Sequence, residues 1–140
     1  SMASPADNVG PLGNQDRNQA SAADPLLSDE DVAIRDITEV PAAEVVTTLA
    51  VHLMTAAAVR CGLAEGPDAP EQVDLAEARI LINALAGLVT TAAPDIGSQH
   101  AAPLRDGLTS LQRAFREASA LPDAPGQGPG EQLTGPVVMR

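Results

Sequence analysis

Aromatic residues are almost missing from this sequence: Phe115 is the only one among 140 residues, and neither tryptophan nor tyrosine occurs. Aromatic side chains normally supply much of the buried area of a domain, so alanine, valine, leucine and isoleucine must build this core. Small aliphatic side chains bury little area per contact, and a foldable part of roughly 80 residues is marginal on core burial alone. The shortage therefore favours oligomerisation as an additional source of burial.

Lysine is also missing, so all eight basic residues are arginine, against 19 acidic residues and a net charge of −11. Because an acidic chain repels phosphate backbones, we expect no binding to nucleic acid. Cys61 is the only cysteine, which excludes an internal disulfide and fits a reducing cytoplasm. The N-terminal stretch has no basic region followed by an apolar one, so we expect no secretory signal peptide.

Two segments are rich in proline, glycine and polar residues, and we predict that residues 1–31 and residues 120–140 are disordered tails. Between them, three apolar-periodic segments from residue 38 to residue 119 predict an all-α domain. Short connections make consecutive helices antiparallel neighbours. The sequence therefore predicts a small three-helix antiparallel unit with a tail on either side.

The first predicted helix runs from about Thr38, as N-cap, to Gly62, with Pro41 in the first turn. Its apolar arc is broad, which implies a helix covered from more than one direction. The arc consists of Val46, Leu49, Ala50, Leu53, Ala56 and Ala57. The apolar run from residue 45 to residue 59 is shorter than the roughly 20 residues that a bilayer requires. We therefore expect a buried bundle helix and no membrane span.

The second predicted helix begins with the capping box of Asp74 and Glu77, and Pro94 is expected to end it. Its apolar face consists of Leu75, Ala78, Ile82, Leu85, Ala86, Val89 and Ala92.

In the third helix Ser98 is a candidate cap, while Pro103 is expected to delay regular helix to about residue 102. Four apolar residues recur at helical spacing there and should face the first two helices: Leu104, Leu108, Leu111 and Phe115.

Residues with potential chemistry are few. His52 is the best single candidate for a catalytic or ligand role, but a histidine on the polar edge of a helix is usually solvated. His52, Cys61 and His100 lack the spacing of a zinc site. Asp95, Ser98 and His100 contain the residue types of a hydrolase triad, but closeness in a capping loop does not assemble one. We therefore predict no catalytic, cofactor-binding or metal-binding residue, and no enzyme; a small His-dependent or metal-dependent enzyme built on His52 is the less favoured alternative.

Three arginines, Arg105, Arg113 and Arg116, form a small basic face on the third helix. Acidic Asp106 and Glu117 are interspersed, which favours a solvated face. A docking site for an acidic partner is the other interpretation.

Three stretches resemble one known family. They are residues 46–54 (VTTLAVHLM), residues 75–85 (LAEARILINAL) and residues 104–117 (LRDGLTSLQRAFRE). Together they are similar to the bacterial domain of unknown function 1844, over about residues 39–119, and residues 128–136 look like the ending of its longer members. The resemblance implies a short, cytosolic, helical protein with no established activity. Genes of that family often lie near those of a translation initiation factor and ribosomal proteins, which implies a protein partner in translation as an alternative function.

Self-association is the function that the sequence favours most. The first two predicted helices carry apolar arcs wider than one neighbouring helix covers, and the narrow stripe of the third cannot cover both. A symmetric homodimer that pairs the first or second helix with its copy would cover the excess. The apolar Leu133, Val137 and Val138 near the C-terminus offer a competing cover, by folding back over the same surface.

Overall fold

The computed structural model describes residues 39–139. The described helices all belong to one compact unit that begins at Ala42. Its elements are α2 (Ala42–Arg60), the 3-10 helix η1 (Ala69–Gln72), α3 (Leu75–Ile96), α4 (Ser98–Ala118) and the single turn α5 (Glu131–Thr134). The described residues contain no strand, so the predicted all-α class is confirmed. The predicted N-terminal tail and Thr38 lie outside the described residues.

Helix α2 starts later and ends where the sequence predicts. It begins at Ala42, so Pro41 precedes the helix instead of lying within its first turn. Proline disfavours helical conformation in the residue before it, here Val40, and the helix therefore starts only after Pro41. At the other end the N–H of Leu63 donates to the carbonyl of Ala58 at 2.9 Å, and the N–H of Gly62 donates to Val59 at 3.1 Å. These two bonds and the φ of +91° at Gly62 form the Schellman motif, which confirms Gly62 as the C′ residue.

The predicted capping box at the start of α3 is half formed. The Asp74 carboxylate accepts a hydrogen bond from the backbone N–H of Glu77 at 3.1 Å, as predicted. The backbone N–H of Asp74 donates instead to the carbonyl of Arg60 at 2.9 Å, so the Glu77 side chain is not needed there. This bond ties the beginning of α3 to the last residue of α2.

Two prolines lie inside helices that we expected them to interrupt. Pro94 does not end α3, which continues to Ile96, and Pro103 does not delay α4, which begins at Ser98. Both prolines lie on exposed surface, where water can bond the carbonyl left without its helical N–H. Gly97, with φ +83°, joins the helices as a one-residue turn and takes the cap position itself, so the Ser98 side chain caps nothing.

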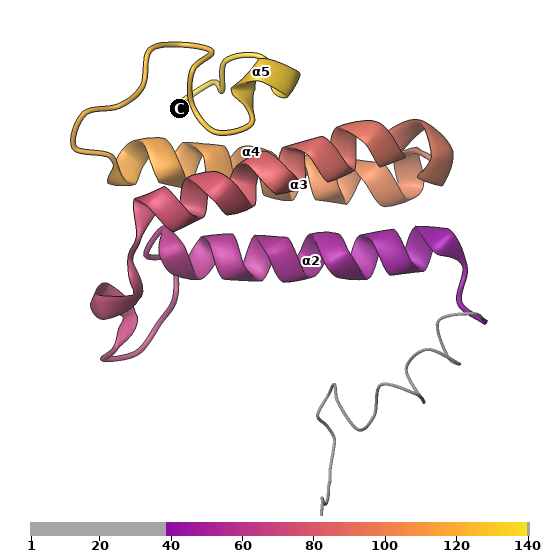
Figure 1. Ribbon diagram of the computed structural model, residues 1–140, viewed down its shortest axis with the longest axis horizontal. Coiled ribbons are helices and arrows are strands. Elements are labelled where there is room, and N and C mark those ends of the chain that lie inside the picture. Colours follow the sequence, from indigo (N-terminus) through magenta and orange to yellow (C-terminus); the bar gives the residue numbers. More distant parts are fainter. Residues whose placement is uncertain (1–38, 140) are drawn as a thin grey trace, which may run out of the picture. The chain divides into compact units, whose positions relative to one another are not determined.

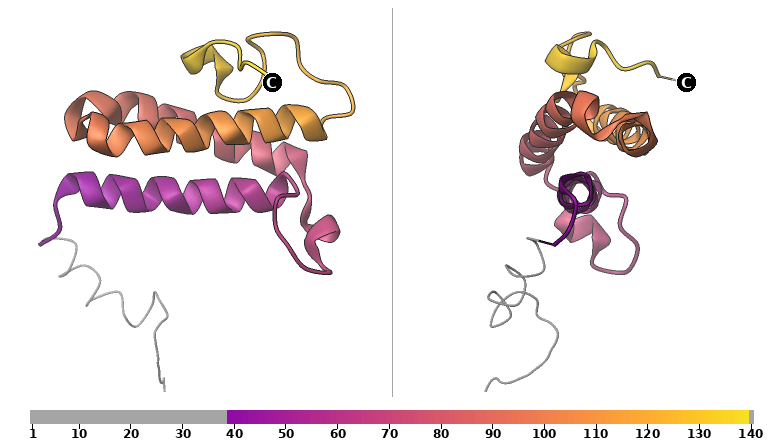
Figure 2. Two further views of the ribbon diagram at one scale, coloured as in Figure 1. Left: turned by 180° about the vertical axis from the view of Figure 1, so that it is seen from behind. Right: turned by 90° about the vertical axis from the view of Figure 1, so that its right-hand side faces the viewer.

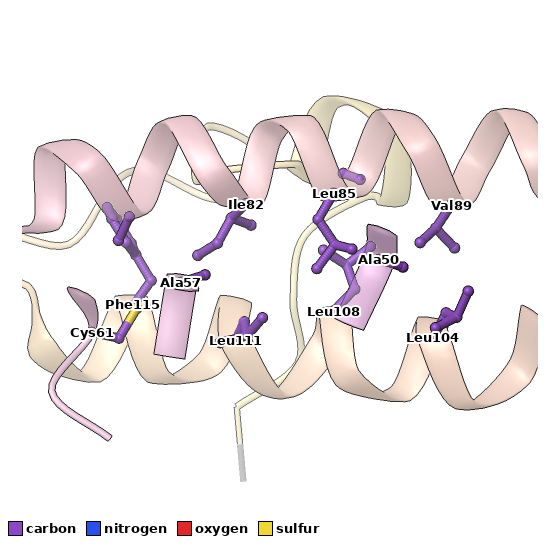
Figure 3. Close-up of a cluster of buried hydrophobic side chains, with 12 residues drawn as sticks. Ala50, Ala57, Cys61, Ile82, Leu85, Val89, Leu104, Leu108, Leu111 and Phe115 are labelled. Carbon is purple, nitrogen blue, oxygen red and sulfur yellow. The ribbon is translucent and has the colours of Figure 1, made fainter. Parts of the chain in front are cut away.

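The three long helices pack against one another as antiparallel neighbours, which confirms the predicted unit (Figures 1 and 2). Leu104, Leu108, Leu111 and Phe115 are each less than 5% exposed and face the other two helices, as predicted (Figure 3). From α3 the core receives Ala78, Ile82, Leu85, Ala86 and Val89. Helix α2 buries only alanines, Ala50 and Ala57. Its larger apolar side chains therefore lie outside the core or at its edge.

The C-terminal residues correct a prediction. Residues 120–139, which we call the C-terminal strap, are not a disordered tail: they run over α3 and α4 and include the helical turn α5 (Figure 1). Prolines and glycines exclude a long helix, but they do not prevent side chains elsewhere from fixing the backbone. The attachment is mainly polar, since Leu133 and Val138 remain 54% and 66% exposed and Val137 is half-buried. The strap therefore does not bury its apolar residues over the surplus surface, as one of our alternatives required.

Candidate functional site

The histidines and the cysteine do not come together. His52 is exposed in the middle of α2, Cys61 is buried beyond its C-terminal end, and His100 lies in the first turn of α4. The end of α2, which Cys61 follows, and the beginning of α4, which contains His100, lie at opposite ends of the bundle (Figure 1). Within residues 39–139, no group of three or more His, Cys, Asp or Glu residues could hold a metal ion.

The triad residue types at the α3–α4 turn are also unassembled. Asp95 and Ser98 are exposed, His100 is half-buried, and no side-chain hydrogen bond joins them in the described part of the chain. Burial raises the pKa of the Cys61 thiol, because desolvation disfavours the thiolate. A nucleophilic cysteine needs the thiolate, so this environment opposes reactivity at neutral pH.

The basic face of α4 holds the C-terminal strap. Arg113 Nε donates to the carbonyl of Val138 at 2.7 Å, and Arg116 Nη1 donates to the carbonyl of Asp123 at 2.7 Å. Of the three arginines of this basic face, Arg105 is exposed, whereas the other two are half-buried. The predicted solvated face is therefore wrong for Arg113 and Arg116, whose donors are used by the chain itself.

An ion pair anchors the beginning of the strap. Arg79 of α3 donates from Nη2 to both carboxylate oxygens of Asp123, at 2.8 and 3.1 Å. Its guanidinium carbon also lies 4.9 Å from the centre of the Phe115 ring, within cation–π distance. The Arg79 side chain is 40% exposed, so this pair positions the strap and adds little to stability.

Two amides attach the middle of the strap. Gln112, only 3% exposed, donates from Nε2 to the carbonyl of Pro129 and to the Thr134 hydroxyl, both at 3.0 Å. Asn83 Oδ1 of α3 accepts from the N–H of Gly130 at 2.8 Å. Sequence reasoning did not single out either amide. The one available signal was a glutamine beside Leu111, at the edge of the apolar stripe of α4.

Glu131 fixes the part of the strap that precedes α5 through hydrogen bonds within the strap itself. The residue is 5% exposed, and its carboxylate accepts from the N–H of Gly126 at 2.8 Å and of Gly128 at 3.3 Å. A hollow of about 420 Å³ lies between the strap and α3, lined by Arg79, Asn83, Gln127, Gly128, Gly130, Gln132 and Leu133. Arg79 Nη2 and Asn83 Oδ1 bond the strap, so these two side chains line the hollow and also hold the strap over it.

The strongest candidate for an interaction site is one side of α2. Val45, Leu49, His52, Ala56 and Val59 follow one another at steps of four and three residues, which places them on one side of the helix. We call these residues the α2 outer face. Leu49 is 53% exposed, His52 is exposed, and the other three are half-buried. The apolar arc predicted from the sequence is thus divided, with Ala50 and Ala57 in the core and Leu49 in solvent.

Helices α2 and α3 are each long and apolar enough to cross a bilayer by length and composition. Core helices of bundles pass the same test, and six residues of α3 are buried. Helix α2 is the less covered of the two.

Fold and surface together define a small antiparallel helical bundle with a polar-anchored strap and a partly exposed apolar face on α2. Residues 42–117, from the first residue of α2 to the penultimate residue of α4, match the family model of the domain of unknown function DUF1844. The chain belongs to this family, as the resemblance predicted. Comparisons with curated proteins and with solved structures give no match.

Proposed function

We propose that this protein is a non-enzymatic module that self-associates through the α2 outer face, most simply as a symmetric dimer. The observation that carries the proposal is the sparse burial of α2: two of its 19 residues are buried, and Leu49 on the α2 outer face is 53% exposed. Water-soluble monomers rarely leave a contiguous apolar helix face uncovered. Covering it would also add the burial that a core with one aromatic residue lacks.

Charge favours a second copy of the chain as the partner. The only charged residues of α2 are Glu44 in its first turn and Arg60 in its last, so the α2 outer face offers nothing to a partner recognised by charge. The net charge of −11 opposes approach to anionic lipid or nucleic acid. A second copy brings the same uncharged apolar face, and a twofold axis makes such a face complementary to itself.

The site residues also support a non-enzymatic function. On α2, the polar neighbours of His52 one turn away are Thr48 and Thr55 and neither is an acid or a base, and the Cys61 thiol has a raised pKa caused by burial. A partner in the translation machinery is the alternative that the family resemblance carries, and no described residue favours it over a second copy.

Sedimentation equilibrium tests the proposal with two matched variants. Leu49 and Leu133 have the same side chain and nearly equal exposure, 53% and 54%, but Leu133 lies on the strap. We expect the wild-type protein and Leu133→Glu to be dimeric, and Leu49→Glu to be monomeric with an unchanged helical circular dichroism spectrum. A wild-type monomer at every concentration would overturn the proposal. Flotation of a monomeric wild-type protein with phosphatidylcholine vesicles, lost in Leu49→Glu, would assign the face to a membrane instead.

A further inference from the structure

His52 occupies a special place on the α2 outer face. It is the only residue of that face with a titratable side chain, and it lies halfway between Glu44 and Arg60, the two charged residues of the helix. It is also the central member of the five residues that form the face. A symmetric pairing of two α2 helices along their full length must therefore bring the two His52 side chains close together.

We propose that α2 pairs with α2 of a second copy in antiparallel orientation, about a twofold axis beside His52, and that protonation of the two facing imidazoles dissociates the dimer. This inference rests on the proposed self-association and adds its geometry and its control by pH. The apolar contacts would then come from the halves of the face on either side of the axis, with Val45 opposite the partner's Val59 and Leu49 opposite the partner's Ala56.

Charge distinguishes antiparallel from parallel pairing. A parallel pair would place Glu44 beside its own copy at one end and Arg60 beside its own copy at the other. Antiparallel pairing brings the acidic end of each helix to the basic end of the other. It also aligns the two helix dipoles in opposite directions, which is favourable for helices lying side by side. Two acidic chains of net charge −11 already repel each other, so the arrangement without further repulsion of like charges is preferred.

The neighbouring helix α3 carries few charges that could compensate the positive charge of a protonated His52. Helix α3 packs along α2 and has no charged residue between Arg79 and Asp95. On α2 itself, Glu44 and Arg60 are each more than two turns from His52. The 3-10 helix η1 contacts α2 and contributes Glu71, beyond the end of α2 that carries Arg60.

Charges on α4 lie on another side of α2. Arg105 and Asp106 precede Gly107, and Gly107 lies against the Met54 side chain of α2. Met54 and His52 are two positions apart, which separates them by about 200° around the helix. The charged group that His52 faces in the proposed dimer is therefore the partner's own histidine.

Acid weakens such a dimer because two imidazolium groups repel each other and lose water at the interface. The neutral form is favoured in the dimer, so association is strongest above the titration range of histidine and is lost as the pH falls through it. We expect the dissociation constant to rise on the order of tenfold between about pH 7.5 and about pH 5.5.

The two histidines of the chain provide a matched pair of variants for this measurement. His100 lies in the first turn of α4, away from the α2 outer face. Sedimentation equilibrium at the two pH values should show the rise in wild type and in His100→Gln, and a pH-independent dimer in His52→Gln. A wild-type dimer whose affinity is unchanged by pH, or an equal rise in His52→Gln, would overturn this inference while leaving the proposed self-association intact. Absence of a dimer at both pH values would overturn both.

Disulfide cross-linking tests the orientation. In a Cys61→Ala background, a cysteine at position 52 meets its copy in either orientation, whereas a cysteine at position 45 meets its copy only in a parallel pair. With an added oxidant, we expect His52→Cys to form a covalent dimer and Val45→Cys to remain uncross-linked. Cross-linking of both variants would show a parallel pair, and cross-linking of neither would exclude an axis beside His52.

Discussion

Gln112 is the residue through which the attachment of the C-terminal strap can be measured most directly. The residue is 3% exposed, and its amide makes two hydrogen bonds to the strap, to the carbonyl of Pro129 and to the Thr134 hydroxyl. Replacement by alanine removes both bonds and leaves the buried Pro129 carbonyl without this donor. A typical bond contributes about 0.5–1.5 kcal/mol, and an unsatisfied buried group costs about 1–3 kcal/mol. The expected loss is therefore about 2–4 kcal/mol.

The loss should be local, because the core of the bundle does not include Gln112. Opening of the strap should become about 30–1,000 times more frequent, since each 1.4 kcal/mol corresponds to a factor of ten. Amide hydrogen exchange at Gly130, Thr134 and Gly135, whose N–H groups are bonded in the closed strap, reports this opening.

The matched control is Gln99→Ala, a glutamine on the same helix that is exposed. It should leave exchange in the strap at the wild-type rate, within a few tenths of a kcal/mol. Unchanged exchange in Gln112→Ala would refute the reasoning, because the strap would then be held without its amide anchor.

Two further predictions concern the core. Leu108 is 2% exposed, so Leu108→Ala should lower the free energy of unfolding by about 2–5 kcal/mol in urea titration, whereas a loss under about 0.5 kcal/mol would remove Leu108 from the core. Cys61 has a raised pKa through burial, so its thiol should resist iodoacetamide at about pH 8 in the native protein and react after unfolding in urea; rapid native labelling would contradict this. The same shift means that Cys61 costs no stability at neutral pH, and that stability falls as the pH rises from the usual titration range of a thiol towards the raised pKa of the folded state.

Local signals made the helical part of the fold predictable. The spacing of Leu104, Leu108, Leu111 and Phe115 placed α4 in the core, and Asp74 and Gly62 marked helix ends through bonds to residues only a few positions away. Pro94 and Pro103 were misjudged because the penalty for a proline depends on whether water can reach the carbonyl that it leaves unbonded. That exposure is a property of the packed bundle and not of the local sequence.

The attachment of the strap could not be predicted, since its partners are distant along the chain. Gly130 bonds Asn83, 47 residues away, and Asp123 bonds Arg79, 44 residues away. A single sequence gives no sign of such pairs, and the local composition of residues 120–140 resembles that of a disordered segment. The breadth of the apolar arc on α2 was predictable, but the division between its core side and its outer face required the positions of α3 and α4.

The one-residue turn at Gly97 has a consequence for the order of folding. With a single residue between α3 and α4, and Asp74 bonded to the end of α2, the helices meet partners that are near in the chain, and contacts of this kind form early and fast. The strap closes loops of 44 and 47 residues and must wait until the α3–α4 surface exists. Its bonds are then absent from the transition state, so Gln112→Ala should speed unfolding in stopped-flow experiments and leave the folding rate nearly unchanged. The strap would thus slow the unfolding of the bundle without changing the rate at which the bundle forms.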